Sequence, residues 1–359
     1  MFIKNIKKLS ILTSIFLLLS TSASFADINV SRIAGNSRYD TAVKVNDEFI
    51  EYSSTNKAVI SSGSDFRTSL YASYMASAFK APLYLNAKHG MTTQVLNKLK
   101  EKKVNNVYIV GGYDLLDKSI DNTLLSKGIK FTRIYDQTKY DKWTKTNVVD
   151  KIPYQVDNIL FTYFHPNVPR GDIGSCILVN DKKFPDMLSV IPLTAQLAKE
   201  DTTGMYDYRG FDSTDGFKLI IGGPSTVPGY IKTYMGDDAP GLNDHTWEDA
   251  DANAPRYYTG RISGKNRYQT AIEIAKTYNP LLGYNLDTIV LVNGQNYPDA
   301  LTSGIAAVSS RAAILLTESD KLNPDTKAFI QDNGIKNVII VGGEKSVSRN
   351  VENELKEIK

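Results

Sequence analysis

Pairs of basic residues recur at one spacing along the chain and could bind an anion. In each of three pairs, a second arginine or a lysine follows an arginine by six positions, and the six residues are Arg32, Arg38, Arg133, Lys139, Arg261 and Arg267. Guanidinium groups bind phosphate through two parallel hydrogen bonds, and a threefold set could hold a repeating polymer with avidity. Alternatively, these side chains form ion pairs with Asp or Glu that tie neighbouring parts of the protein together.

The basic pairs belong to longer internal repeats. Residues 32–42 read RIAGNSRYDTA and recur at 261–271 as RISGKNRYQTA, with a weaker copy at 133–140 that lacks the glycine. Two further landmarks recur with them. An apolar run ends in Gly-Gly at 108–112, 219–223 and 339–343, and an aromatic residue follows a strand-like run at Phe66, Phe184 and Tyr297. A repeat at this period predicts three related units, at residues 27–131, 132–258 and 259–359.

Within a unit, the hydrophobic pattern alternates between helix and strand periods. In the third unit, residues 271–278 carry apolar side chains on one helix face, and continuous apolar runs follow at 288–292 and 312–316. Asn323 and Pro324 are suited to begin a helix that ends near Gly334. Apolar strands separated by amphipathic helices indicate a parallel sheet covered on both faces. We therefore expect an α/β protein made of three small three-layer domains.

The second unit departs from the other two. The distance from its arginine to its aromatic landmark is 51 residues, against 34 and 36 in the first and third units. We interpret this as an insertion around residues 152–175, which contain His165 and Arg170. A second departure, at residues 235–255, is rich in acidic residues and has no Lys or Arg before Pro255. It is typical of a solvated loop, and a calcium site is the alternative, although the ligand spacing of an EF-hand is missing.

The first 26 residues have the pattern of a cleaved signal peptide. Three lysines precede an apolar run at 11–19, and small residues lead to a cleavage site before Asp27. Without those lysines, the 42 basic residues fall to 39, equal to the 39 acidic ones. A neutral mature chain argues against a nucleic-acid partner, and no further run is long enough to span a membrane. The single cysteine, Cys176, cannot form an internal disulfide and is expected to be buried and inert.

Catalytic and cofactor signatures are weak. The three histidines fall in different units: His89, His165 and His245. They lack the spacing of a zinc site, and Gly-x-Ser-x-Gly and a complete P-loop are also missing, so we expect no metal, no cofactor and no catalytic residues. A pair of glycosidase carboxylates stays open because carboxylates are plentiful. Asp186 and Asp299 share one repeat position, but Thr68 in the first unit weakens a common acid–base role.

The repeated segments, the Tyr-Pro-Asp-Ala sequence at 297–300 and the Val-Gly-Gly strands resemble the cell wall binding repeat 2 family across essentially the whole mature chain. The resemblance implies small Toprim-like, flavodoxin-like α/β domains arranged with pseudo-threefold symmetry. It also implies that an exported protein attaches non-covalently to the Gram-positive cell wall through an anionic secondary wall polymer. The expected localisation is therefore secreted, at the cell wall or cell surface.

A Pro-Ile-Leu-Leu motif that the family uses in polymer attachment has two matches here. Its residues would be Pro82, Leu83, Tyr84 and Leu85 in the first unit, and Ala313, Ile314, Leu315 and Leu316 in the third. The role in attachment rests on the resemblance, since composition alone favours a buried strand, with proline at its start. Residues 204–208 of the second unit depart from the motif.

These observations favour a wall-binding protein that is not an enzyme, with an anionic glycopolymer as its partner and surface-layer proteins as further candidates. Two other functions stay open. One is a peptidoglycan hydrolase or amidase whose active site lies on the divergent second unit. The other is an adhesin that uses the insertions at 152–175 or 235–255.

Overall fold

The computed structural model describes residues 27–142, 145–168, 175–200, 202–209, 217–228 and 260–358. The predicted signal peptide, Arg170, the acidic segment 235–255 and His245 lie outside these residues. The strands are β1 (Asn29–Ile33), β2 (Lys57–Ser62), β3 (Leu83–Asn86), β4 (Asn106–Val110), β5 (Lys130–Ile134), β6 (Gln137–Asp141), β7 (Thr146–Asp150), β8 (Ser175–Val179), β9 (Gly204–Asp207), β10 (Phe217–Ile221), β11 (Gly260–Ile262), β12 (Thr288–Asn293), β13 (Ala313–Thr317) and β14 (Asn337–Val341).

Helices cover the sheets that these strands form. They are α1 (Arg38–Phe49), α2 (Phe66–Phe79), α3 (Thr93–Glu101), α4 (Lys118–Ser126), α5 (Ile152–Phe164), α6 (Phe184–Glu200), α7 (Arg267–Lys276), α8 (Tyr278–Leu282), α9 (Ser303–Ser309), α10 (Pro324–Asp332) and α11 (Arg349–Lys356), with short 3-10 turns η1 (Tyr52–Ser54) and η3 (Pro298–Thr302). The mixed α/β class expected from the sequence is confirmed.

The third unit shows how local sequence produces these elements. Strand β12 is buried along its whole length, as its unbroken apolar run predicted. The side chain of Asn323 accepts hydrogen bonds from the backbone N–H groups of Asp325 and Thr326, and Pro324 occupies the first turn of α10. The helix ends before Gly334, whose φ of +64° is accessible to glycine at little cost. The boundaries predicted for this helix are therefore confirmed.

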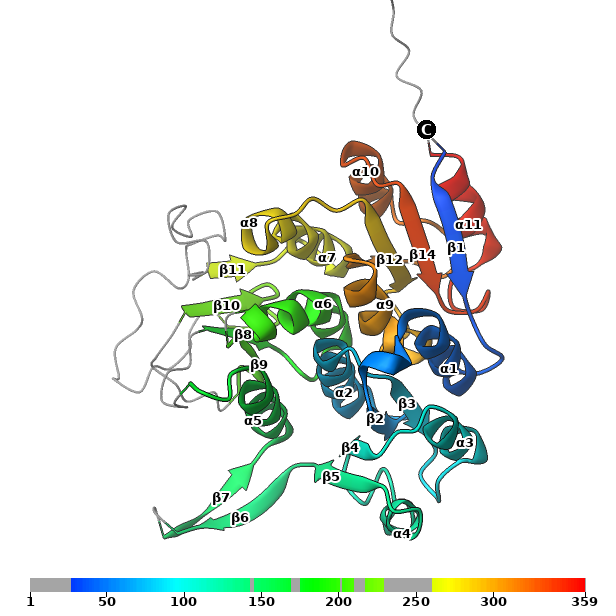
Figure 1. Cartoon of the computed structure of the whole chain (residues 1–359). Helices are drawn as coiled ribbons and strands as arrows, with labels where there is room; N and C mark the ends of the chain where they lie inside the picture. Colours follow the sequence, from blue (N-terminus) through cyan, green and yellow to red (C-terminus); the bar gives the residue numbers. More distant parts are fainter. Residues whose placement is uncertain are drawn as a thin grey trace, which may run out of the picture.

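In the described part of the chain, three parallel four-stranded sheets form the body of the protein, with strand orders β3-β2-β4-β5, β9-β8-β10-β11 and β13-β12-β14-β1 (Figure 1). In each sheet one outer strand carries an Arg-Ile pair and lies beside the strand that ends in Gly-Gly. The registers pair Ile134 with Val110, Ile262 with Ile221, and Ile33 with Val341. Each Arg-Ile strand thus joins the sheet of another sequence unit, and the sheets extend across the unit boundaries expected from the repeats.

Helices α2, α6 and α9 pack against one another between the three sheets (Figure 1). The aromatic landmarks of the three units meet beside this helix contact. The ring centroid of Phe66 lies 6.2 Å from that of Phe184 and 5.4 Å from that of Tyr297, and the last two are 5.8 Å apart. A position recognised in the sequence by its spacing alone therefore joins the three units through aromatic contacts.

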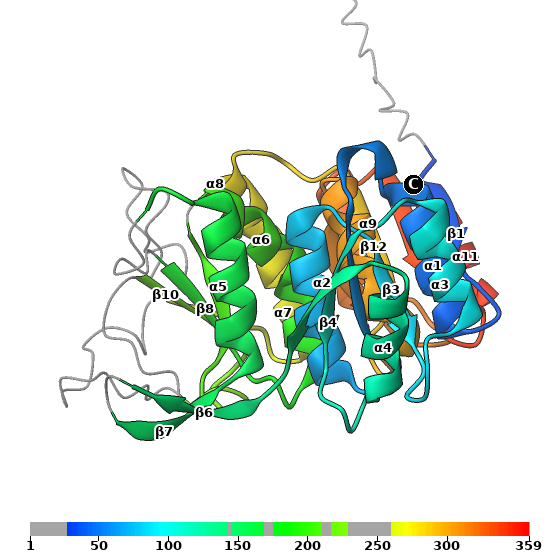
Figure 2. The same ribbon diagram turned by 60° about the horizontal axis from the view of Figure 1, so that its bottom comes forward.

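The extra segment of the second unit is an antiparallel hairpin, β6–β7, which extends from the body of the protein (Figure 2). Helix α5 follows it and corresponds to α1 and α7, which follow their Arg-Ile strands directly. The insertion expected at residues 152–175 is therefore placed wrongly. Lys139 and Tyr140 lie on β6 but have the same spacing from Arg133 as the helix-start residues of the other units have from their arginines, so the sequence pattern placed the extra residues in a later segment.

Candidate functional site

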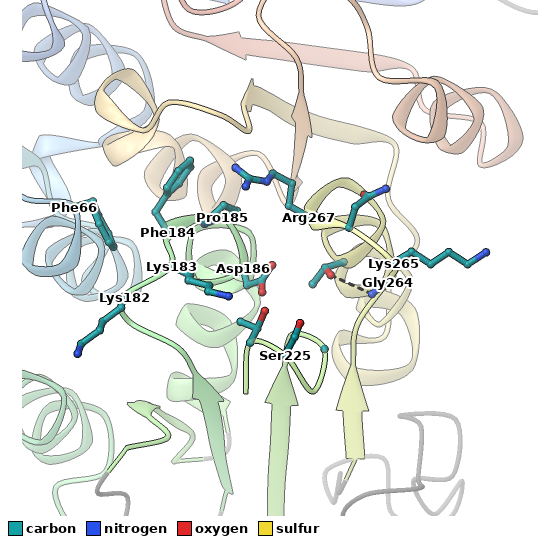
Figure 3. Close-up of a pocket in the computed structure, with 14 residues that line it drawn as sticks. Phe66, Lys182, Lys183, Phe184, Pro185, Asp186, Ser225, Gly264, Lys265 and Arg267 are labelled. Carbon is teal, nitrogen blue, oxygen red and sulfur yellow. Dashed lines mark hydrogen bonds between the residues drawn. The ribbon is translucent and has the colours of Figure 1, made fainter. Parts of the chain in front are cut away.

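The carboxyl ends of β8, β10 and β11 meet at one edge of the second sheet and enclose a pocket of about 440 Å³ (Figure 3). Its walls are the loop and helix start at 182–186, the Gly-Gly turn with residues 225 and 226, and the segment 264–270. Phe66 of α2 closes one side, so side chains from all three sequence units contribute. Ligands commonly bind beyond the carboxyl ends of parallel strands, where loops converge.

Asp186 lies at the base of this pocket, in the first turn of α6. The carboxylate is close to Gly222, where an added Cβ would approach Oδ2 to within 2.7 Å. Burial raises the pKa of Asp186 to about 6, although the charges of Arg267 and Lys183 act to lower it. The site therefore holds one acidic group that is costly to charge.

Four cationic side chains line the same pocket: Lys182, Lys183, Lys265 and Arg267. Lys183 points toward Asp186, whereas Lys182 and Lys265 extend outward on opposite sides (Figure 3). Among the lining residues that the structure describes, Asp186 is the one acidic residue, so these residues carry a clear positive excess. Such a concentration of one sign of charge in a concave site attracts anions.

The leading arginines of the three basic pairs bind the protein itself. Nη1 of Arg133 donates to the carbonyl oxygens of Gly111 and Leu116 at 2.9 Å each, and Nη2 lies 2.5 Å from Asp121. Arg32 and Arg261 donate in the same way to the carbonyl oxygen of their Gly-Gly turn and to a second carbonyl beyond it. Each guanidinium thus fastens an Arg-Ile strand to the neighbouring turn. Arg32 and Arg133 also form the kind of ion pair that the structural alternative expected, whereas the contacts of Arg261 are with backbone carbonyl oxygens.

The second basic residues of the three pairs do not share one type of contact. Arg38 donates to the carbonyl oxygen of Gly63, and Nη1 of Arg267 donates to that of Gly294 at 2.5 Å. Lys139 lies on the hairpin, where it forms an ion pair with Asp150. Of the six predicted basic residues, all of which are described, Arg267 is the one that lines the pocket at the second sheet.

Residues 82–85 and 313–316 lie in or at the start of outer strands β3 and β13, and their side chains are buried. These segments form the buried strands that their composition predicted. Residues 204–207 form the corresponding strand β9 despite their divergent sequence. A role of these segments in polymer attachment stays a prediction, and it would have to act through packing, because the side chains belong to the hydrophobic core.

Sequence reasoning missed Lys182, Lys183 and Lys265. Each lies in a loop next to a repeat landmark, where an isolated lysine looks like an ordinary solvated residue. The difference in charge between the units was visible in the sequence. When Phe66 is aligned with Phe184, Ser64 and Asp65 of the first unit correspond to Lys182 and Lys183. Comparison of loop charge between units, rather than of shared residues, would have found them.

Among the described residues, His89, His165 and Cys176 lie apart from the pocket. His89 contacts Asp117, and Nε2 of His165 lies 3.0 Å from the carbonyl oxygen of Ala198. Cys176 is buried on β8, as expected. Across the described residues, three or more His, Cys, Asp or Glu side chains nowhere gather in a group that could hold a metal ion. Over the same ranges, every helix is too short or too polar to cross a membrane.

The sequence of this chain matches the cell wall binding domain 2 (CWB2) family at residues 32–121 and 261–352, which together are about half of its length. The chain belongs to this family. Both matched segments begin at an Arg-Ile strand, so the resemblance given by the repeats is confirmed. The family assignment identifies a secreted protein of the cell wall or cell surface.

Two curated relatives come from Bacillus subtilis (strain 168). N-acetylmuramoyl-L-alanine amidase LytC is 25% identical over 361 residues, which cover 97% of this chain and 62% of the relative. The protein described as amidase enhancer is 22% identical over 330 residues, which cover 90% of this chain and 40% of the relative. The chain therefore spans less than two thirds of the length of either relative.

Two solved structures from Clostridium difficile share the fold. Cwp6 aligns with a TM-score of 0.66 and 17% identity over 92% of this chain and 48% of its own. Cwp8 aligns with a TM-score of 0.65 and 16% identity over 92% of this chain and 52% of its own. Because identity is low, the likeness concerns the fold.

Proposed function

We propose that the protein attaches non-covalently to the cell wall by binding an anionic wall polymer in the pocket at the end of β8, β10 and β11. The observation that carries this proposal is the cavity itself, whose described lining holds four cations and one acidic residue. The mature sequence as a whole has equal numbers of basic and acidic residues, so a polyanion would be attracted by a local concentration of cations rather than by the whole protein. Membership of a wall-binding family supports this choice of ligand.

The pocket offers several kinds of anion contact. Lys183 supplies a positive charge in its interior, and Ser225 and Thr226 supply hydroxyl donors beside the Gly-Gly turn. Helices α6 and α7 both begin at the pocket, so their first N–H groups add partial positive charge. Arg267 is held in place by its bond to the Gly294 carbonyl oxygen and needs no rearrangement to contribute its charge.

Retention on purified walls tests this proposal. The triple variant Lys182→Gln, Lys183→Gln, Lys265→Gln removes three charges from exposed side chains and should leave the fold intact. A matched control replaces Lys118, Lys127 and Lys130, which are exposed on and beside α4, by Gln. We expect the pocket variant to be lost from walls at lower salt than the wild type and the control. Equal retention of all three proteins would contradict the proposed site.

The amidase relative makes a wall-hydrolysing activity the second candidate function, with a site on the divergent second unit. The two functions differ in a direct assay, since a hydrolase would clear a gel that contains purified peptidoglycan. We expect no cleared band from the purified chain. Lysis of peptidoglycan by this protein alone would replace the binding function by an enzymatic one.

A further inference from the structure

The corresponding ends of the other two sheets lack the lysines of the pocket. Lys182 lies two positions before the aromatic residue of the second unit. The same position is Ser64 in the first unit and Gln295 in the third. Directly before the aromatic residue stands Lys183, and the other units have Asn296 and Asp65 there. Of the three loops that precede the aromatic residues, the one at the second sheet therefore carries lysines and the other two do not.

The loop after the Arg-Ile strand repeats this difference. Lys265 follows Gly264 in the pocket, while Asn36 follows Gly35 at the third sheet. At the first sheet the Arg-Ile strand leads instead to Asp136, a carboxylate that forms an ion pair with Arg67 at 2.8 Å. An anion at that edge would meet a carboxylate and an arginine that is already paired.

The three pocket lysines carry no bonded partner at their ammonium groups in the described residues, although Lys183 faces Asp186. Across the described residues, neither an ion pair nor a side-chain hydrogen bond engages the ammonium group of Lys182, Lys183 or Lys265. In contrast, Lys98 and Lys139 are paired with carboxylates elsewhere on the surface. An unpaired ammonium group attracts an anion without first giving up an existing partner.

The lysines are also arranged in sequence across the opening. Lys182 and Lys265 extend outward from opposite edges, and Lys183 lies between them, directed into the pocket (Figure 3). These directions favour a ligand with several anionic groups over a single anion. A linear chain of anionic groups could lie across the pocket and contact all three.

Building on the proposed function, we propose that each protein chain has one principal polyanion site, at the second sheet, and that a linear polymer crosses it from Lys182 to Lys265. The other two sheet edges serve the fold and do not bind the polymer with comparable affinity. Repetition of the fold thus supplies a scaffold, and local substitutions in one unit supply the ligand site.

Calorimetric titration with inorganic phosphates of increasing length tests this inference on the full mature chain. We expect tripolyphosphate to bind with a stoichiometry of one and at least about tenfold more tightly than orthophosphate, because three contacts replace one. The Lys182→Gln, Lys183→Gln, Lys265→Gln variant should lose this length dependence. The variant of Lys118, Lys127 and Lys130 should keep it, and thermal melting should confirm that both variants fold.

A stoichiometry of three, equal affinity for both phosphates, or equal weakening of the pocket and control variants would each overturn the inference. These outcomes are separate from failure of the proposed function. If wall retention depends on the anionic polymer but tripolyphosphate binds at three equal sites, attachment stands and the single site is wrong. If the wall polymer is not bound by any form of the protein, the proposed function itself is wrong.

Discussion

Arg32 in the first strand and Glu352 in the last helix are hydrogen-bonded side chain to side chain, with Nε of the arginine 3.1 Å from Oε2 across 320 residues of sequence. The same guanidinium donates to the carbonyl oxygens of Gly342 and Val347 at 2.9 and 2.7 Å. Strand β1 pairs with β14 alongside these contacts. The beginning of the described chain therefore completes the sheet formed by its end.

Replacement of Arg32 by Gln should lower the free energy of unfolding by about 2 kcal/mol, since it leaves partly buried carbonyl and carboxylate acceptors without their donor. Urea denaturation followed by circular dichroism measures this change. Arg349→Gln is the control, because Arg349 pairs with Glu344 at the exposed surface and should contribute less than about 1 kcal/mol. Equal effects of the two substitutions would show that the Arg32 contacts do not fasten β1 to the last sheet.

Substitution of Gly304 by Val should destabilise the contact among the three central helices. A Cβ at this position would lie 2.7 Å from Cγ2 of Ile191 and 2.8 Å from the hydroxyl oxygens of Ser73 and Ser77. Overpacking of this kind costs about 2 kcal/mol, and we expect a lower midpoint of thermal unfolding. Gly343→Val is the control for this steric explanation, because a Cβ at Gly343 has no neighbour within 4 Å. A stable Gly304 variant would contradict the close helix contact.

The stability of the protein should depend on the ionisation of Asp186. Its pKa is raised from 3.8 to about 6 in the folded protein, so the proton is held more tightly there than in the unfolded chain. The stability that comes from this tighter proton binding is fully present below about pH 4 and is lost as the pH rises through about 6. Asp186→Asn keeps the neutral form at every pH.

We therefore expect the Asp186→Asn variant to exceed the wild type by about 3 kcal/mol in free energy of unfolding at pH 7.5, from a shift of about two pKa units. The difference should shrink as the pH approaches 4. Urea denaturation of both proteins across this range measures it. Parallel stability curves would show that Asp186 is not the group responsible.

The local elements could be predicted from the sequence, because their signals are local. The apolar run of β12 and the Asn323–Pro324 start of α10 depend on burial and capping within a few residues. The repeat spacing matched Phe66 with Tyr297, but it did not predict that the two rings are in contact.

The exchange of strands between units could not be predicted in this way. The strand before Gly-Gly reads NVYIV in the first unit and NVIIV in the third, so periodicity does not choose which of the two pairs with β1. The hairpin misled the comparison for a related reason, since Lys139 matched a repeat position by spacing while it lay in a different element. A search for residues that the units share does not find the candidate site, because its lysines are present in one unit and are replaced by other residue types in the others.

The most direct test of wall attachment through an anionic polymer is sedimentation of the purified protein with native walls and with walls treated with hydrofluoric acid, which cleaves phosphodiester-linked polymers from peptidoglycan. We predict that native walls retain the wild-type protein, that stripped walls release it, and that the variant of Lys182, Lys183 and Lys265 is poorly retained by both. If stripped walls hold the wild-type protein as well as native walls do, the polymer is not its ligand.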